Sequence, residues 1–147
     1  MNTSIAVLLE HKDSTVHTVS PTLTVAEAVQ VMIEKKVSSV LVMEQKRLVG
    51  IFTERDVLRR VIGANLDPKA TKLRDVMSTG LATISPATTL KDTMEIFSEK
   101  HCRHLPVISG EQLVGVISIG DVSRWLTNLH RAEAEQLRDY ISGGYSG

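Results

Sequence analysis

Two short stretches, "GIFTERD" (residues 50–56) and "GVISIGD" (residues 115–121), follow one pattern: a glycine, two apolar residues, a hydroxyl residue, two variable positions and an aspartate. The two glycines stand 65 positions apart, and the same offset aligns residues 18–57 with residues 83–122 without a gap. Of these 40 aligned pairs, 12 are identical, whereas ordinary amino-acid usage gives roughly two or three matches by chance. The sequence therefore predicts two copies of one structural unit, the first and second repeats, related by a pseudo-twofold axis.

Each repeat shows the same order of predicted elements. Capping-box patterns, Thr24 with Glu27 and Thr89 with Asp92, indicate the start of a helix. Two apolar runs joined by a short polar turn follow, which predicts two strands buried on both faces. These strands are expected at residues 39–43 and 48–52, and at residues 104–108 and 113–117. A second helix is expected to begin near the motif aspartate, so each unit reads β-α-β-β-α.

The predicted fold class is α/β (α+β), with two β-α-β-β-α units packed sheet to sheet. Residues 1–65 are assigned to the first repeat with a short N-terminal helix at residues 4–10, and residues 66–130 to the second repeat. Residues 131–147 are expected to extend the last helix into a flexible, glycine-rich tail. A polar linker at residues 63–72 separates the repeats, followed by one helical turn at residues 73–77 and a strand near residues 81–84.

Composition excludes several classes of function. The chain has 147 residues, with 17 Lys and Arg against 17 Asp and Glu, so no field of one sign attracts nucleic acid or an anionic membrane. The single cysteine, Cys102, excludes an internal disulfide, and "HCRH" (residues 101–104) offers too few ligands for a metal. No apolar run approaches the ~20 residues of a membrane span, and no signal pattern begins the chain. We therefore expect a soluble, cytoplasmic protein without a metal.

Two interpretations of the repeated motif remain open. Thr53 with Asp56, and Ser118 with Asp121, have the spacing of a capping box at the start of a helix. Capping alone does not explain the glycine three residues before the hydroxyl in both repeats. A glycine permits close approach of a backbone or a flat ligand, a hydroxyl and helix amides can hold a phosphate, and a carboxylate can accept both ribose hydroxyls. The pattern therefore also suits a nucleotide.

The two motifs, each inside its strand and helix frame, resemble the cystathionine-β-synthase (CBS) domain, and the tandem resembles a CBS pair, or Bateman module. A strand such as "HLPVI" (residues 104–108) before the motif is part of this resemblance, which covers residues 5–127. The final segment, residues 118–145, is similar to small stand-alone CBS-pair proteins of bacteria and plant organelles. The resemblance implies two clefts, each lined by both repeats, that hold an adenine nucleotide such as AMP, ADP, ATP or NAD.

The resemblance also implies roles for individual residues. Asp56 and Asp121 would bind ribose hydroxyls, and Thr53 and Ser118 would contact phosphate. The other residues implied at the base or along the cleft walls are Thr18, Val19, Val37, Ser39, Val40, Gly50, Arg55, Thr83, Ile84, Cys102, Arg103, His104, Pro106, Gly115 and Ile119. The second repeat has Arg103 and His104 where the first has serines, so the two clefts are expected to bind unequally.

The predicted function is a non-enzymatic regulatory module that senses an adenine nucleotide and modulates a partner protein. No serine or cysteine has a legible base beside it, so neither catalysis nor a catalytic cofactor is expected. A homodimer is expected because Val122, Trp125, Leu126 and Leu129 form an apolar stripe on the last helix. The alternative is a constitutive dimerisation or interaction module whose motifs are only helix caps.

Overall fold

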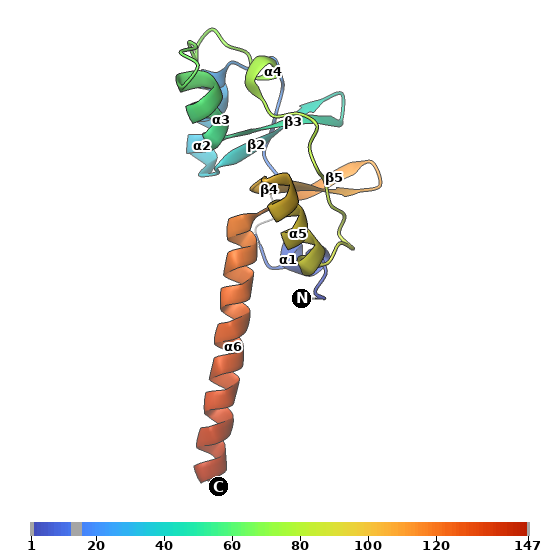
Figure 1. Cartoon of the computed structure of the whole chain (residues 1–147), viewed down its shortest axis with the longest axis vertical. Helices are drawn as coiled ribbons and strands as arrows, with labels where there is room; N and C mark the ends of the chain where they lie inside the picture. The colour runs from blue at the N-terminus through green and yellow to red at the C-terminus, as the bar shows by residue number, and fades with distance from the viewer. Residues whose placement is uncertain (1, 13–15, 147) are drawn as a thin grey trace.

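The structure, a computed structural model, describes residues 2–12 and 16–146. Two small sheets lie next to each other in the middle of the main body, and helices cover the outer side of each (Figure 1). The first unit contains β1 (Thr18–Val19), α2 (Val25–Lys35), β2 (Ser39–Glu44), β3 (Arg47–Thr53), α3 (Glu54–Asp56) and the π-helical turn η1 (Val57–Ile62). The second contains α5 (Leu90–Lys100), β4 (His104–Ser109), β5 (Gln112–Ser118) and α6 (Ile119–Ser146). The fold class is confirmed, and the predicted order of strands and helices is present in the first unit and, except for the first strand, in the second.

The two sheets repeat the same pairing. β1 lies parallel to β2, and β2 pairs antiparallel with β3 with an irregularity between Val42 and Met43. β4 pairs antiparallel with β5 with an irregularity between Val107 and Ile108, the equivalent position. The strand expected near residues 81–84 is reduced to a single parallel bridge between Ile84 and Val107. The pseudo-symmetry therefore extends from the motifs to the register of the strands.

Two short helices are exchanged between the units. α1 (Ile5–Glu10) buries Ile5 and Leu8 in the core of the second unit, whereas α4 (Leu73–Val76) buries Leu73 and Val76 in the core of the first. Each helix therefore precedes one repeat in the chain and packs on the other. The boundary between the two repeats at residue 65 stays a prediction. That boundary assigns α1 to the first repeat, but α1 packs on the core of the second unit.

The last helix, α6, is a single helix of 28 residues that ends at Ser146. Its first turns pack on the second unit, and the remainder extends away from the main body (Figure 1). The helix includes Gly143 and Gly144, which the sequence analysis placed in a flexible tail. No helix within residues 2–12 and 16–146 is long and apolar enough to cross a membrane.

The two motif glycines lie where another part of the chain passes close to the strand. A Cβ on Gly50 would lie 2.7 Å from Sδ of Met77 and 2.9 Å from the carbonyl oxygen of Ser78. The backbone of Ser78 is held there by two hydrogen bonds with Ile51. A Cβ on Gly115 would lie 2.8 Å from Cδ2 of Leu9 on α1. The glycines thus make room for the exchanged segments of the chain itself.

Candidate functional site

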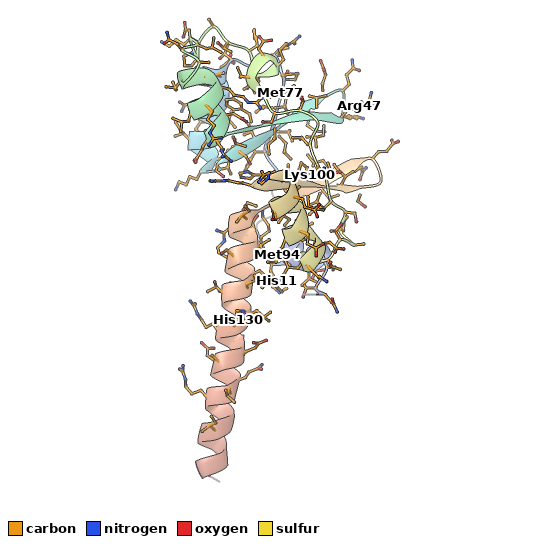
Figure 2. The ribbon with its side chains drawn as sticks, viewed as in Figure 1. His11, Arg47, Met77, Met94, Lys100 and His130 are labelled. Carbon is orange, nitrogen blue, oxygen red and sulfur yellow. The ribbon has the colours of Figure 1, made fainter. Side chains whose placement is uncertain are left out.

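A cleft of about 1120 Å³ is lined by both units. Its walls come from the first motif at the end of β3, from residues 78–82 after α4, from residues 100–104 between α5 and β4, and from the start of α6. Figure 2 places Lys100 at the boundary between the two units. Segments that are far apart in the sequence therefore form one cavity.

Asp56 lies at the start of the helix that follows β3 and is only 7% exposed. Its Oδ2 accepts a hydrogen bond from the backbone amide of Thr53 at 3.0 Å, and its own amide donates to the Thr53 hydroxyl at 3.2 Å. Oδ1 accepts a hydrogen bond from the Ser78 hydroxyl at 3.2 Å and lies 3.6 Å from Nε of Arg60. The capping box is present, and Oδ1 remains close to a neutral donor that a ligand hydroxyl can replace.

Asp121 forms the same cap with Ser118, at 2.8 and 3.1 Å, but its other partners are cations. The Lys12 ammonium donates to Oδ2 of Asp121 at 2.8 Å and to the carbonyl oxygen of Val116 at 2.8 Å. Arg124 donates to Oδ1 at 2.5 Å. Burial raises the pKa of the Asp121 carboxyl, but hydrogen bonds from Lys12 and Ser118 outweigh burial and hold the pKa below its ordinary value. The two motif aspartates therefore have different chemical surroundings.

The second unit contributes Cys102, Arg103 and His104 to the lining of the cleft. Nε2 of His104 lies 3.3 Å from the Ser38 hydroxyl, a hydrogen bond between the two units. Burial lowers the pKa of His104, and the charge of Asp121 opposes this shift without cancelling it, so the imidazole is neutral at pH 7. Burial likewise raises the pKa of the Cys102 thiol, which is therefore protonated and unreactive at neutral pH.

The structure brings together eight of the residues that the sequence analysis selected. Those that line the cleft are Thr53, Arg55, Asp56, Cys102, Arg103, His104, Ser118 and Ile119. Asp121 instead lines a smaller cavity of about 540 Å³ between α1 and α6, together with Lys12, Arg124 and Trp125. The others line neither cavity: Thr18, Val19, Val37, Ser39, Val40, Gly50, Thr83, Ile84, Pro106 and Gly115. Their part in binding stays a prediction.

Four residues that contact the motif aspartates were missed. Arg60 follows Asp56 by four positions across the junction of α3 and η1, and Arg124 follows Asp121 by three positions on α6. Such a spacing in consecutive helical turns brings side chains together and could have identified both arginines. Ser78 and Lys12 come from segments that follow α4 and α1. No motif marks these two residues, because they lie outside the stretch that repeats without a gap.

Within residues 2–12 and 16–146, no three His, Cys, Asp or Glu side chains lie close enough to hold a metal ion. The donors around the cleft are instead hydroxyls, backbone amides and cationic side chains, set against a nearly buried carboxylate. In this set the carboxylate can accept hydrogen bonds from ribose hydroxyls, and the cations and hydroxyls can bind phosphate oxygens.

Comparison with known proteins identifies the family. A model of the CBS domain matches residues 12–63 and 73–128. The chain therefore belongs to the CBS domain family, and it carries two copies of the domain in a pair of the Bateman type.

The chain is 39% identical over 127 residues to the CBS domain-containing protein CBSX3, mitochondrial, of Arabidopsis thaliana, covering 83% of this chain and 62% of that protein. It therefore spans less than two thirds of that relative. A putative signal-transduction protein with CBS domains from Burkholderia ambifaria has a TM-score of 0.81 and 33% identity, over 84% of this chain and 93% of that chain. A hexameric CBS-CP12 protein from bloom-forming cyanobacteria has a TM-score of 0.75 and 28% identity, over 83% of this chain and 67% of that chain.

Proposed function

We propose that this CBS pair is a regulatory module that binds an adenine nucleotide in the cleft between its two units. The observation that carries the proposal is the composition of this cleft. The motif pair Thr53 and Asp56 of the first unit lines the same cavity as Arg103 and His104 of the second, and Ser118 lines it too. Ribose and phosphate groups thus find their expected partners within one site.

Asp56 is the residue proposed to hold the ribose. Its Oδ1 accepts a hydrogen bond from the Ser78 hydroxyl at 3.2 Å. A ribose hydroxyl is chemically equivalent to this serine hydroxyl, so exchange leaves the buried carboxylate hydrogen-bonded. At Asp121 the same exchange would have to displace the charged Lys12, which also donates to Val116. We therefore propose Asp56 as the stronger ribose site.

The regulatory role follows from the position of the cleft. A ligand there touches both units and the first turns of α6, of which Ile119, Gly120 and Arg124 line the wall. A nucleotide that binds one relative arrangement of the units more tightly shifts the population toward that arrangement. The shift cannot exceed the difference between the affinities of the nucleotide for the two arrangements. A partner protein that contacts either unit or α6 would sense the shift. Catalysis is not part of this proposal.

Assembly into a homodimer remains a proposal with a changed basis. Val122 is buried, and Trp125 and Leu126 pack on the core of their own unit, so the stripe on which the expectation rested is largely used within the chain. Leu129 of this stripe stays exposed, and so do apolar side chains elsewhere, including Ile33 on α2 and Leu58 and Ile62 on η1. Such side chains favour contact with a second protein surface. Light scattering at micromolar concentration should give twice the 16.2 kDa mass of the chain; a single chain mass would contradict dimerisation.

A thermal-unfolding screen tests nucleotide binding. AMP, ADP, ATP and NAD are each added at increasing concentration, with S-adenosylmethionine as a further adenosine compound. A nucleotide at about 100 times its dissociation constant adds about 2.7 kcal/mol to the stability of the folded state, so the melting temperature should rise with concentration. The alternative, a module whose motifs only cap helices, is supported by the complete capping boxes at Asp56 and Asp121. It predicts no rise with any of these compounds.

A further inference from the structure

Three cationic side chains on the cleft wall have no carboxylate partner. Arg55 lies on α3, Lys100 at the end of α5 and Arg103 just before β4, and all three are exposed and line the cleft. Among the residues that the structure describes, none of the three is within 4.0 Å of an Asp or Glu oxygen. Their charges are therefore available to a ligand.

The other charges of the cleft are largely neutralised. Arg124 is paired with Asp121, and Asp56 lies 3.6 Å from Arg60. Glu54 is the remaining acid on the wall, and it is exposed. Three free cations against one free carboxylate leave the cleft with an excess of positive charge, although the chain as a whole has a formal net charge of zero. The excess is a local property of this site.

The three cations come from both units, and the space between them is large. Sites for compact small molecules occupy about 300–1,000 Å³, and this cleft measures about 1120 Å³. One phosphate group has few oxygens to share among two guanidinium groups and an ammonium. A chain of two or three phosphates has more charge and more acceptors, and each arginine can bind two oxygens in parallel.

We propose that this cleft selects nucleotides that carry a diphosphate or triphosphate chain over the monophosphate, through Arg55, Lys100 and Arg103. The inference rests on the proposed nucleotide binding at Asp56 and adds the class of ligand. The ribose lies at the nearly buried carboxylate, and the phosphate chain extends toward the cations of both units. The length of the phosphate chain thereby decides how many cations the ligand engages.

Calorimetric titration of AMP, ADP and ATP without divalent metal tests the proposal. We expect ATP to bind about tenfold or more tightly than AMP, as one added charge-assisted hydrogen bond predicts, and to lose more affinity than AMP when salt is added. Arg55→Ala and Arg103→Ala should each lower the affinity for ATP strongly and the affinity for AMP only a little. Arg74→Ala, an exposed arginine outside the cleft, is the matched control and should leave both affinities unchanged.

Equal affinities of AMP and ATP for the wild type would overturn the proposal while leaving nucleotide binding intact. If Arg55→Ala and Arg103→Ala reduce the affinities for AMP and ATP by the same factor, the proposal is also wrong, because these side chains would then bind only the phosphate that both nucleotides share. If none of the three nucleotides binds, the proposed function itself is wrong, and this inference is wrong with it.

Discussion

The two motif aspartates show how one sequence pattern acquires two kinds of chemistry. Both cap a helix through the same pair of hydrogen bonds. Asp56 receives its third hydrogen bond from the neutral Ser78, whereas Asp121 receives it from the ammonium of Lys12. A neutral donor is exchanged for a ligand hydroxyl at little cost, but removal of the ammonium takes away one of the two cations that pair with the Asp121 carboxylate. The difference between the two half-sites therefore originates outside the motifs.

Substitution of Lys12 should make this difference visible as a pH-dependent loss of stability. The lowered pKa of Asp121 means that its ionised form stabilises the folded state. That contribution is present above the unfolded-state pKa of about 3.9, and it is lost as the pH falls through the lower folded-state value. Lys12→Met should thus cost about 1 kcal/mol at pH 7, and less at pH 3, which lies below the unfolded-state value. Urea unfolding at both pH values measures the two differences.

The control for this experiment is Lys91→Met, at an exposed lysine on α5 that has no carboxylate within 4.0 Å in the described part of the chain. This substitution also removes one positive charge, and it should change the free energy of unfolding little at either pH. A Lys12→Met penalty of the same size at pH 3 and pH 7 would show that Lys12 acts through packing or through Val116 alone.

At the residue scale, the sequence predicted what is local and missed what is distant. The capping partners are three positions apart, so their spacing alone places them together. Ser78 and Lys12 reach the aspartates from 22 and 109 positions away. Only the folded arrangement of α4 and α1 brings them there, and neither residue carries a signal that distinguishes it from other surface serines and lysines.

At the scale of elements, each motif glycine belongs to a contact between a strand and an exchanged segment. A glycine at this position permits the close approach of either a backbone or a flat ligand. At Gly50 the neighbour is the backbone at Ser78, and at Gly115 it is the side chain of Leu9. Repetition of the glycine thus has a structural cause in both units, although the neighbouring atoms differ.

Alanine substitutions should separate these two contacts. In Gly50→Ala the new methyl group would meet the Ser78 carbonyl, which two hydrogen bonds to Ile51 hold in place, so a cost of about 1–3 kcal/mol is expected. In Gly115→Ala the methyl would meet only the end of the Leu9 side chain, which can change rotamer, so less than about 1 kcal/mol is expected. Chemical unfolding of the two variants measures both costs; equal costs, or a larger one at Gly115, would contradict this explanation.

The order of the elements could be predicted from the sequence, but the packing of the short helices could not. Apolar runs and capping boxes define α2, α5 and the four longer strands locally. α1 and α4 are each short and apolar on one face, and such a helix fits either core. Position in the chain therefore predicts that α1 belongs to the repeat that follows it, whereas Ile5 and Leu8 lie in the core of the other unit.

At the scale of the whole molecule, the two motif aspartates line two cavities that are not equivalent. The larger cleft joins the first motif to the cationic wall of the second unit, and the smaller cavity joins Asp121 to α1 and α6. The expectation of two different sites came from the unequal residues of the repeats, and the contacts of Lys12 add a further difference. Unequal binding itself stays a prediction.

The most direct test of the account is a crystal structure of the wild-type chain with ATP at a concentration that saturates it. The account predicts density for one nucleotide in the cleft between the units, with ribose hydroxyls within hydrogen-bonding distance of the Asp56 carboxylate and phosphates beside Arg55 or Arg103. Ordered ATP bound elsewhere, or an empty cleft with Asp56 still bonded to Ser78 under these conditions, would contradict it.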